Sequence, residues 1–141
     1  MTIAIRPATA SDFDAIAEVW EASVRATHDF LPVSEIEALR PVLREQYLPA
    51  VDLQVAVGAD GGIAGFIGTA AGKIEMLFIA PAARGSGIGS ALMARTDAPE
   101  VDVNEQNTQA LDFYRRRGFQ VVGRSPLDGQ GRPYPLLHLR R

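Results

Sequence analysis

The chain has 141 residues, of which 47% are hydrophobic and 22% charged, enough for one domain with an apolar core and too few for two. Because it has no cysteine, it can form no disulfide, no Cys-ligated metal centre and no thiol nucleophile, and two histidines are too few for an all-protein transition-metal site, so no metal is expected. The net charge of -3 argues against a nucleic-acid partner, since such proteins carry a basic surface.

The sequence also shows no sign of a membrane or export segment. No apolar run approaches the ~20 residues of a membrane helix, and the first residues lack the charged start and apolar stretch of a signal peptide. We therefore expect a soluble, cytoplasmic protein with no membrane partner, folded as a single domain over residues 1–141.

The N-terminal third is expected to contain two helices. Ser11 with Asp14, and Ser34 with Glu37, each have the spacing of a capping box, in which the two residues satisfy free backbone N–H groups at a helix start. The first helix should run to about residue 24 and pack an apolar face on the core. The second should run to about residue 48 and be kinked or split at Pro41.

Alternating apolar residues and glycine or proline breaks predict the other elements. Helices are expected at about 89–96 and 108–117, the second ending at Gly118, because glycine readily adopts left-handed backbone at a helix end. The order, β-α-α-β-β-β-α-β-α-β-β, indicates a mixed α/β fold. The expected strands are residues 3–6, 53–57, 63–69, 73–79, 101–104, 119–123 and 136–140.

Residues 76–93 combine a strand, a glycine-rich turn and the start of a helix. Several free N–H groups converge at such a turn, so a phosphorylated ligand is expected, the alternative being a turn without a ligand. A Walker loop would need Gly-Lys-Ser/Thr, which is absent. A dinucleotide motif would need a third glycine three positions after the second, whereas Gly85, Gly87 and Gly89 are evenly spaced.

Two motifs resemble the GCN5-related N-acetyltransferase (GNAT) superfamily. Arg84-x-x-Gly87-x-Gly89, after a strand that ends at Pro81, is similar to the family's pyrophosphate loop. Residues 103–119 resemble the family's strand, Asn-capped helix and Tyr-x-x-x-Gly-Phe ending. Shorter stretches that resemble small bacterial members of the family are residues 27–31 and 132–137.

The resemblance implies a mixed, mostly antiparallel central sheet with two splayed parallel strands, 73–79 and 101–104, and flanking helices. It implies acetyl-CoA as the acyl donor, with the pantetheine arm paired to the first of these strands and backbone N–H groups near Leu77 polarising the thioester carbonyl. A Cβ at Gly87 or Gly89 is expected to obstruct the approach of phosphate. The residues implied to bind the cofactor are Leu77, Phe78, Ile79, Arg84, Gly85, Ser86, Gly87, Ile88, Gly89, Ser90, Asn107 and Tyr114.

Tyr114 matches the family's general-acid position. A phenol of pKa ~10 can supply a proton to a departing thiolate of pKa ~8.5. The alternative is an aromatic side chain that packs beside Phe113. Asn107 lies two helical turns earlier, on the same face, and would cap the helix or contact the pantetheine arm. Residues 115–117, three arginines, are interpreted as a solvated helix end, with contact to the cofactor's phosphate as the alternative.

Glu75 is the candidate base for the acceptor amine, because the resemblance places an acidic residue on this strand; the alternative is a salt-bridged surface glutamate. Strict alternation would put Lys73, Glu75 and Leu77 on one face of the strand, and Ile74, Met76 and Phe78 on the other. Lys73, the only lysine in the chain, is then expected to pair with Glu75 and lower its pKa.

The acceptor cleft is expected between the first two helices. His28 is a second titratable candidate there, although the adjacent aspartate can equally hold it in place, and His138 is interpreted as structural. The residues expected to line the acceptor cleft are His28, Phe30 and Tyr47, with Tyr134 as a further candidate.

The sequence therefore predicts an N-acetyltransferase that moves an acetyl group from acetyl-CoA to a primary amine by direct attack in a ternary complex. The alternatives are a non-catalytic acyl-CoA sensor and an enzyme for a longer acyl-CoA. The acceptor stays open among small amines and peptide amines, and the protein is expected to be a monomer or homodimer. The helix after Gly89 is unusually short, which puts in doubt how well that side of the core is covered.

Overall fold

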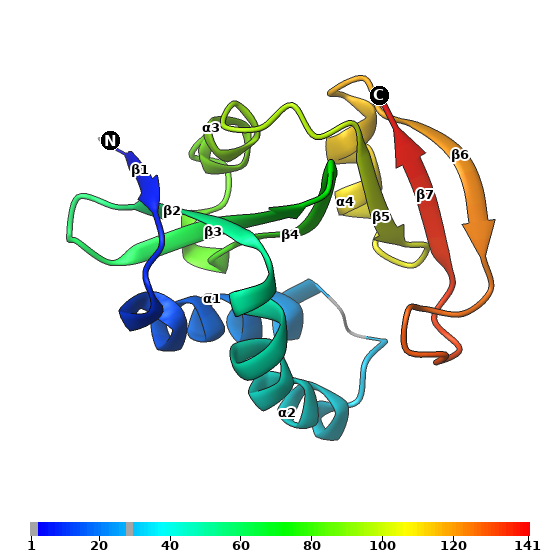
Figure 1. Cartoon of the computed structure of the whole chain (residues 1–141), viewed down its shortest axis with the longest axis horizontal. Helices are drawn as coiled ribbons and strands as arrows, with labels where there is room; N and C mark the ends of the chain where they lie inside the picture. Colours follow the sequence, from blue (N-terminus) through cyan, green and yellow to red (C-terminus); the bar gives the residue numbers. More distant parts are fainter. Residues whose placement is uncertain (1–2, 28–29) are drawn as a thin grey trace.

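In a computed structural model, which describes residues 3–27 and 30–141, seven strands form one sheet in the order β1-β2-β3-β4-β5-β7-β6 (Figure 1). Neighbouring strands are antiparallel except β4 and β5, which run parallel. The predicted mixed, mostly antiparallel sheet is thus confirmed. The strands are β1 (Ala4–Pro7), β2 (Asp52–Val57), β3 (Ile63–Ala70), β4 (Lys73–Ile79), β5 (Glu100–Asn104), β6 (Gln120–Ser125) and β7 (Leu136–Arg140).

Helices cover both faces of this sheet (Figure 1). The side chains of Phe66 and Ile67, which are neighbours on β3, belong to different buried clusters, because successive residues of a strand point to opposite faces. The first two helices cover one face and the last two the other. They are α1 (Phe13–Thr27), α2 (Val33–Val42), α3 (Ile88–Met93) and α4 (Thr108–Arg115). Within the described residues, none is long and apolar enough to cross a membrane.

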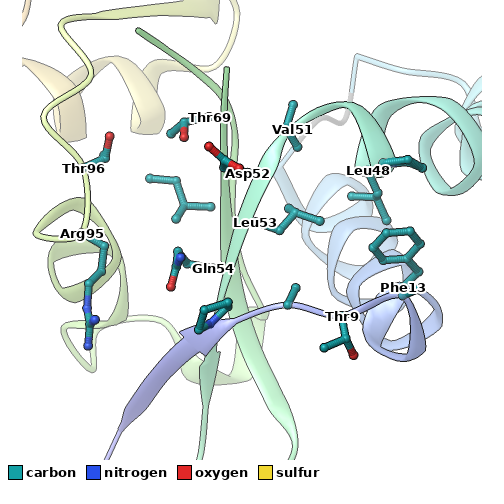
Figure 2. A pocket seen from close by; sticks show the side chains of 15 residues that line it. Thr9, Phe13, Leu48, Val51, Asp52, Leu53, Gln54, Thr69, Arg95 and Thr96 are labelled. Carbon is teal, nitrogen blue, oxygen red and sulfur yellow. The ribbon is translucent and has the colours of Figure 1, made fainter. Parts of the chain in front are cut away.

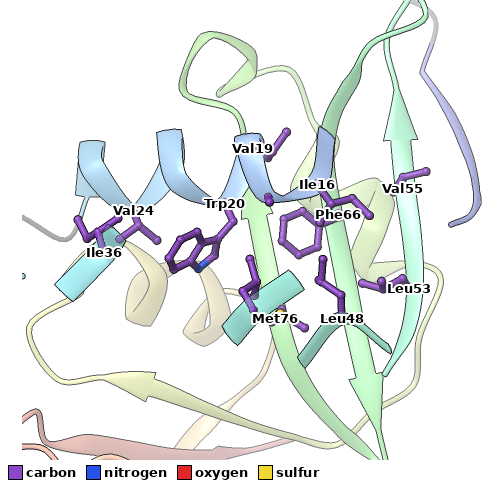
Figure 3. Packing of buried hydrophobic residues seen from close by; sticks show 12 residues of the cluster. Ile16, Val19, Trp20, Val24, Ile36, Leu48, Leu53, Val55, Phe66 and Met76 are labelled. Atoms are coloured by element: carbon purple, nitrogen blue, oxygen red, sulfur yellow. The ribbon is translucent and has the colours of Figure 1, made fainter. Parts of the chain in front are cut away.

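A cluster of buried hydrophobic side chains lies between α1 and the sheet and forms the core of this face (Figure 3). Trp20 on α1 points toward the sheet, Ile16 lies beside Phe66, and Val24 lies beside Ile36 of α2. Helical spacing puts these apolar α1 residues on one stripe, so their burial fixes the helix on the sheet. This packing gives the central strands, which carry the functional site described below, a rigid support, because the Phe66 side chain is fully buried.

Neither helix begins where the capping-box pattern predicts. In the first, the Asp12 carboxylate, not Asp14, accepts a hydrogen bond (2.8 Å) from a backbone N–H, that of Thr9. Asp14 instead accepts one (2.5 Å) from Arg44, far along the chain.

The second helix has Pro32 at its N-cap, so the predicted box of Ser34 with Glu37 is wrong as well. The proline ring, which fixes the backbone angle φ, suits the start of a helix. This explains why the helix begins at a different residue from the predicted one. The predicted division near Pro41 is confirmed, because α2 ends at Val42 and a wider π turn, Leu43–Tyr47, follows.

Strand β4 contains a β-bulge that breaks the predicted alternation. Gly68 on β3 pairs with Met76 and Thr69 pairs with Ile74, so Glu75 is an extra residue with no partner on β3. Ile74 consequently packs with the α3 and α4 cluster, whereas Met76 packs with the α1 cluster. The prediction that Ile74 and Met76 share a face is therefore wrong. The extra residue, Glu75, shifts the alternation of side chains, so that Ile74 and Met76 point to opposite faces of the sheet.

Helix α3 has only six residues, and the segment after it is held by Arg141. The Arg141 guanidinium donates to the carbonyls of Thr96 and Ala98 (both 3.1 Å), and its backbone N–H donates to the Pro99 carbonyl (2.9 Å). These bonds hold the segment between α3 and β5 in place.

Candidate active site

The parallel strands β4 and β5 separate soon after they begin. Only Lys73 with Glu100 and Ile74 with Val101 are paired in register, although β4 continues to Ile79. Because β3 pairs with the other edge of β4, the edge that faces β5 is left with unpaired backbone groups beyond Ile74. The predicted splay of two parallel strands is therefore present, and it offers N–H and C=O groups to an extended ligand.

The glycine-rich loop owes its shape to left-handed backbone at two positions. Gly85 has φ 78° and Gly87, the N-cap of α3, has φ 83°, conformations that other residues rarely adopt. Gly89 has a different role from the one predicted. A Cβ there would lie 2.9 Å from Cε1 of Phe113, so its missing side chain allows α3 to pack on α4 rather than keeping a path for phosphate.

Helix α4 presents Asn107 and Tyr114 to the splay. The Asn107 side chain caps the helix by accepting a hydrogen bond (3.2 Å) from the Ala110 N–H, and Gly118 (φ 92°) follows the helix end as predicted. Tyr114 is 6% exposed and contacts Phe113 and Phe119 edge-on, with ring centroids 5.2 and 5.4 Å apart. Burial raises the pKa of the Tyr114 hydroxyl above its usual value, with Arg117 opposing. The hydroxyl therefore stays protonated at neutral pH.

These elements line one cleft of about 460 Å³. It contains nearly the whole predicted cofactor set: Leu77, Phe78, Ile79, Arg84, Gly85, Gly87, Ile88, Gly89, Ser90, Asn107 and Tyr114. Ser86 is the exception, because its hydroxyl donates to the Ala83 carbonyl inside the loop. Lining residues that the prediction missed are Ser23, Thr27, Ala83, Gln109, Ala110, Phe113, Arg116 and Arg117.

Two of the three arginines interpreted as a solvated helix end thus lie in the cleft wall, and only Arg115 does not. The signal that could have found Arg117 is its spacing from Tyr114. Arg117 lies in the turn just after α4, three residues beyond Tyr114, and its backbone N–H donates to the Tyr114 carbonyl (2.9 Å).

Glu75 lines a smaller cavity of about 110 Å³ between β4 and β5. Tyr114 and Asn107 line it as well, so the two residues predicted to be catalytic face the same space. The bulge and the separation of the strands leave Glu75 exposed. Asp102 on β5 is the other acidic residue in this wall.

Lys73 pairs with Asp102, not with Glu75 as predicted. Lys73 Nζ lies 2.5 Å from Asp102 Oδ2 across the paired start of the two strands. Burial would lower the pKa of Lys73, but hydrogen bonding and charge attraction to Asp102 raise it, with a further contribution from the charge of Glu75. Asp102 is the better partner because it lies on the adjacent strand, whereas the bulge displaces Glu75.

The ion pair continues into a polar chain across two more strands, β7 and β6. Asp102 Oδ1 lies 2.7 Å from His138 Nδ1, and His138 Nε2 lies 2.6 Å from the Ser125 hydroxyl. Burial would raise the pKa of Asp102, yet the hydrogen bonds from Lys73 and His138 hold it below its usual value. The structural interpretation of His138 is supported, since both ring nitrogens have partners. This chain, Lys73–Asp102–His138–Ser125, runs from β4 to β6.

Outside the cleft, side chains from distant segments form two groups of contacts, which together we call the clasp. One group is Phe30, Glu35, Arg132 and Tyr134, and the other is Tyr47 with Gln130. The Tyr134 hydroxyl donates to the Glu35 carboxylate (2.8 Å), which raises the pKa of Tyr134, and Gln130 donates to the Tyr47 hydroxyl. Phe30 packs on Tyr134 with ring centroids 5.9 Å apart. The structure thus places Phe30 and Tyr134 in contact, while Tyr47 contacts Gln130, and none of the three lines the cleft. The predicted acceptor residue His28 lies outside the described residues.

A separate cavity of about 420 Å³ opens where β1 ends beside β2 (Figure 2). Thr96, Arg95, Gln54 and Thr69 line the side next to the end of α3, while Phe13 and other apolar residues line the opposite side. The short α3 leaves this space beside the sheet. None of the predicted catalytic or cofactor residues lines it.

An open strand edge leading to a loop of free N–H groups suits an extended thioester ligand with a phosphate end, which defines the class of acyl-CoA-dependent transferases. The family profile described as "Acetyltransferase (GNAT) domain" matches residues 52–121. Together with the relatives below, this shows that the chain belongs to the GNAT family, and that it transfers an acetyl group from acetyl-CoA to an amine.

The chain is 41% identical to the peptidyl-lysine N-acetyltransferase YjaB of Escherichia coli (strain K12) over 143 residues, which cover 99% of this chain and 97% of that protein. The solution structure of apo-form YjaB superposes with a TM-score of 0.88 at 38% identity, covering 99% of this chain and 97% of that chain. A Thermoplasma acidophilum PaiA N-acetyltransferase in complex with coenzyme A shares the fold, with a TM-score of 0.76 at 23% identity. The match covers 100% of this chain and 99% of that chain.

Proposed function

We propose that this protein acetylates the ε-amino group of lysine in a peptide or protein, by direct attack of the amine on acetyl-CoA in a ternary complex. The support for lysine is the full-length similarity to a peptidyl-lysine N-acetyltransferase. The observation that carries the mechanism is that Tyr114 and Glu75 line one small cavity between β4 and β5. The proposal includes a single domain over residues 1–141, acting in the cytoplasm as a monomer or homodimer.

The cleft fits acetyl-CoA on two observations of its shape. The free edge of β4 beyond Ile74 can pair with the amides of the pantetheine arm, and N–H groups near Leu77 can polarise the thioester carbonyl. The loop at Gly85 and Gly87 turns its backbone with no Cβ in the way. Bound acetyl-CoA supplies the activated acetyl group, and the chain supplies position and hydrogen bonds.

Tyr114 is proposed as the donor to the leaving sulfur. As the C–S bond breaks, negative charge grows on sulfur, and a protonated hydroxyl can stabilise it. Because burial raises the pKa of Tyr114, complete proton transfer to a thiolate of pKa ~8.5 would be unfavourable as a separate step. The proton should therefore move only as the sulfur departs and the attacking nitrogen loses its own proton.

Glu75 is proposed as the base. The acceptor arrives as an ammonium, which must lose a proton before its nitrogen can form the new C–N bond. Asp102, the other carboxylate of the cavity wall, is already paired with Lys73 and His138. Glu75 is left to attract the ammonium and take its proton. The remaining acceptor proposals are Phe30 and Tyr47 in the clasp, and His28.

The size of the cavity favours a two-carbon acyl group. Ile74 and Val101, 2% and 3% exposed, close the point where the strands separate. A longer acyl chain would have to displace one of these packed side chains, which costs ~1–3 kcal/mol for an overpacked core.

The test is release of CoA thiol from acetyl-CoA with a panel of lysine peptides and small amines. Wild-type protein should acetylate lysine peptides, and Tyr114→Phe should lower kcat by about a hundredfold to a thousandfold with acetyl-CoA still bound. Glu75→Gln should lower kcat/KM for the peptide, while Glu45→Gln, an exposed glutamate on the π turn, serves as the matched control.

Tight acetyl-CoA binding with no turnover on any amine would favour the sensor alternative. Turnover of small amines but of no lysine peptide would contradict the acceptor assignment while leaving the reaction intact.

A further inference from the structure

Three polar side chains on neighbouring strands follow one another across the sheet. Asp102 on β5 pairs directly with His138 on β7, and Ser125 lies on β6, the strand beyond. The His138 ring lies between the other two side chains, with Nδ1 2.7 Å from Asp102 Oδ1 and Nε2 2.6 Å from the Ser125 hydroxyl. A carboxylate that holds an imidazole, which in turn contacts a hydroxyl, is the arrangement that activates a serine as a nucleophile.

The hydrogen bonds fix which nitrogen of the ring carries the proton. An ionised carboxylate can only accept, so in the neutral ring Nδ1 donates to Asp102, and Nε2 is left to accept from the Ser125 hydroxyl. Lys73 binds the other oxygen of Asp102 and so keeps this carboxylate charged and in place. The two bonds that hold the His138 ring therefore also prepare Nε2 to take a proton from Ser125.

The three side chains lie on a face of the sheet that a small molecule can reach. Val101 and Leu139, the strand neighbours of Asp102 and His138, are buried against α3 and α4, so the two polar side chains point to the opposite face. Within the described residues, the core that α1 and α2 cover on that face includes none from β5, β6 or β7. The His138 side chain is accordingly 37% exposed, and Ser125 is half-buried.

Strand β6 also supplies donors for a negatively charged oxygen. It is the last strand of the sheet, so the backbone N–H groups on its outer edge have no partner strand in the described part of the chain. Alternate residues of a strand direct their N–H groups to its two sides. The outer edge of β6 thus offers N–H groups close to Ser125, where they can stabilise the oxyanion that forms when a hydroxyl attacks a carbonyl carbon.

The surroundings favour a small, uncharged substrate. The charged side chains nearby pair with one another, Arg124 with Glu105 and Lys73 with Asp102. Neither Ser125 nor His138 lines any of the three cavities described above, so the site is an open surface and not a deep pocket. A neutral ester of a short carboxylic acid fits both observations.

We propose that Ser125 and His138 form a second catalytic site, which hydrolyses small neutral carboxylic esters, with Asp102 as a positioning residue. Ser125 Oγ bonds to the carbonyl carbon while its proton passes to His138 Nε2. The C–O bond to the alcohol breaks, and Nε2 gives the proton to the leaving oxygen. Water then attacks the acyl-serine and passes a proton to Nε2, which returns it to Ser125 Oγ as the carboxylic acid leaves. This activity does not depend on acetyl transfer in the acetyl-CoA cleft.

Two probes test the site, p-nitrophenyl acetate as the ester and a fluorophosphonate that labels activated serines. Mass spectrometry of the labelled wild-type protein should find the phosphonyl group on Ser125. Ser125→Ala should lower kcat for p-nitrophenyl acetate by about a hundredfold. Ser11→Ala is the matched control and should change nothing, because the hydroxyl of this exposed serine bonds Thr9 and not a histidine.

Asp102→Asn separates positioning from a structural role. It should lower kcat by about tenfold to a hundredfold with KM unchanged, because Asp102 orients the His138 ring without touching the ester. A change in KM alone would overturn the positioning role.

The proposal as a whole is overturned if the fluorophosphonate leaves Ser125 of the wild-type protein unlabelled, a result that needs no variant to fold. Equal rates of ester hydrolysis in Ser125→Ala and wild type would overturn it as well. Both outcomes leave the acetylation of lysine peptides untouched, since that reaction uses the other side of β4.

Discussion

The regions proposed to bind acetyl-CoA and the acceptor, called here the cofactor side and the acceptor side, are built in different ways. The proposed cofactor side consists of backbone: the free edge of β4 and a loop whose shape depends on Gly85 and Gly87. The proposed acceptor side, the clasp, consists of side chains that meet over long distances in sequence, as Tyr134 meets Glu35. A site made of backbone tolerates change in most side chains but not in its glycines. A wall made of paired side chains can be altered one partner at a time.

The largest expected effect tests the packing of the cofactor side. Gly89→Ala places a Cβ 2.9 Å from the Phe113 ring, which cannot retreat freely because Arg117 covers it. Overpacking of this kind should lower the free energy of unfolding by about 1–3 kcal/mol and weaken acetyl-CoA binding. Urea denaturation and titration with acetyl-CoA measure the two effects.

Gly129→Ala in the loop between β6 and β7 is the control, because a Cβ there meets nothing within 4 Å. If the two variants are equally stable, α3 and α4 are not as tightly packed as the structure has them.

A smaller effect is expected from the polar chain Lys73–Asp102–His138–Ser125. Asp102→Asn removes the carboxylate between Lys73 and His138 and should cost about 1.5 kcal/mol at neutral pH. Because the folded protein holds the pKa of Asp102 below its usual value, this stabilisation is fully present above the ordinary carboxyl pKa and is lost as the pH falls through the folded pKa. The difference in unfolding free energy between wild type and variant should therefore shrink in acid.

Urea denaturation at neutral pH and at about pH 3, where an ordinary carboxyl group is mostly protonated, measures this difference. A gap of the same size at both pH values would contradict the role of the Asp102 charge.

The smallest effect tests the clasp. Tyr134→Phe removes the hydroxyl that donates to Glu35 but keeps the ring that packs on Phe30. Stability should fall only slightly, because the hydrogen bond lies near solvent. The KM for a lysine peptide should change several-fold with the Kd of acetyl-CoA unchanged, as steady-state kinetics and titration can show. A matching loss of acetyl-CoA affinity would mean that the clasp belongs to the cofactor side after all.

The contrast between local patterns and long-range contacts also explains which parts of the site could be predicted from the sequence. The glycine loop and Tyr114 lie in short local motifs, and the resemblance of those motifs to the GNAT family is what predicted that they share one cleft. The partner of Lys73 could not, because it depends on a bulge at Glu75 that no periodicity reveals. Residues 115–117 were interpreted as a solvated helix end, with contact to the cofactor's phosphate as the alternative, because cations are favourable at a helix C-terminus without any ligand.

In the fold as well, the features that depend on local patterns could be predicted and those that depend on distant contacts could not. The order of strands and helices could be read from apolar spacing and from glycine and proline breaks. Helix starts could not, since Asp14 and Glu37 had the right spacing for caps while distant arginines, Arg44 and Arg25, were available as partners. Competition between a local cap and a long-range ion pair is decided by the tertiary structure.

The pairing of Lys73 also has a practical meaning for an enzyme proposed to modify lysine. It is the only lysine of the chain, and its ammonium is held by Asp102 with a raised pKa, so little of it is the free amine that attacks a thioester. The protein is a poor target for its own chemistry and for non-enzymatic acetylation of its side chains. In a mass-spectrometric assay, acetyl-lysine peptides would therefore report on the added substrate and hardly on the enzyme.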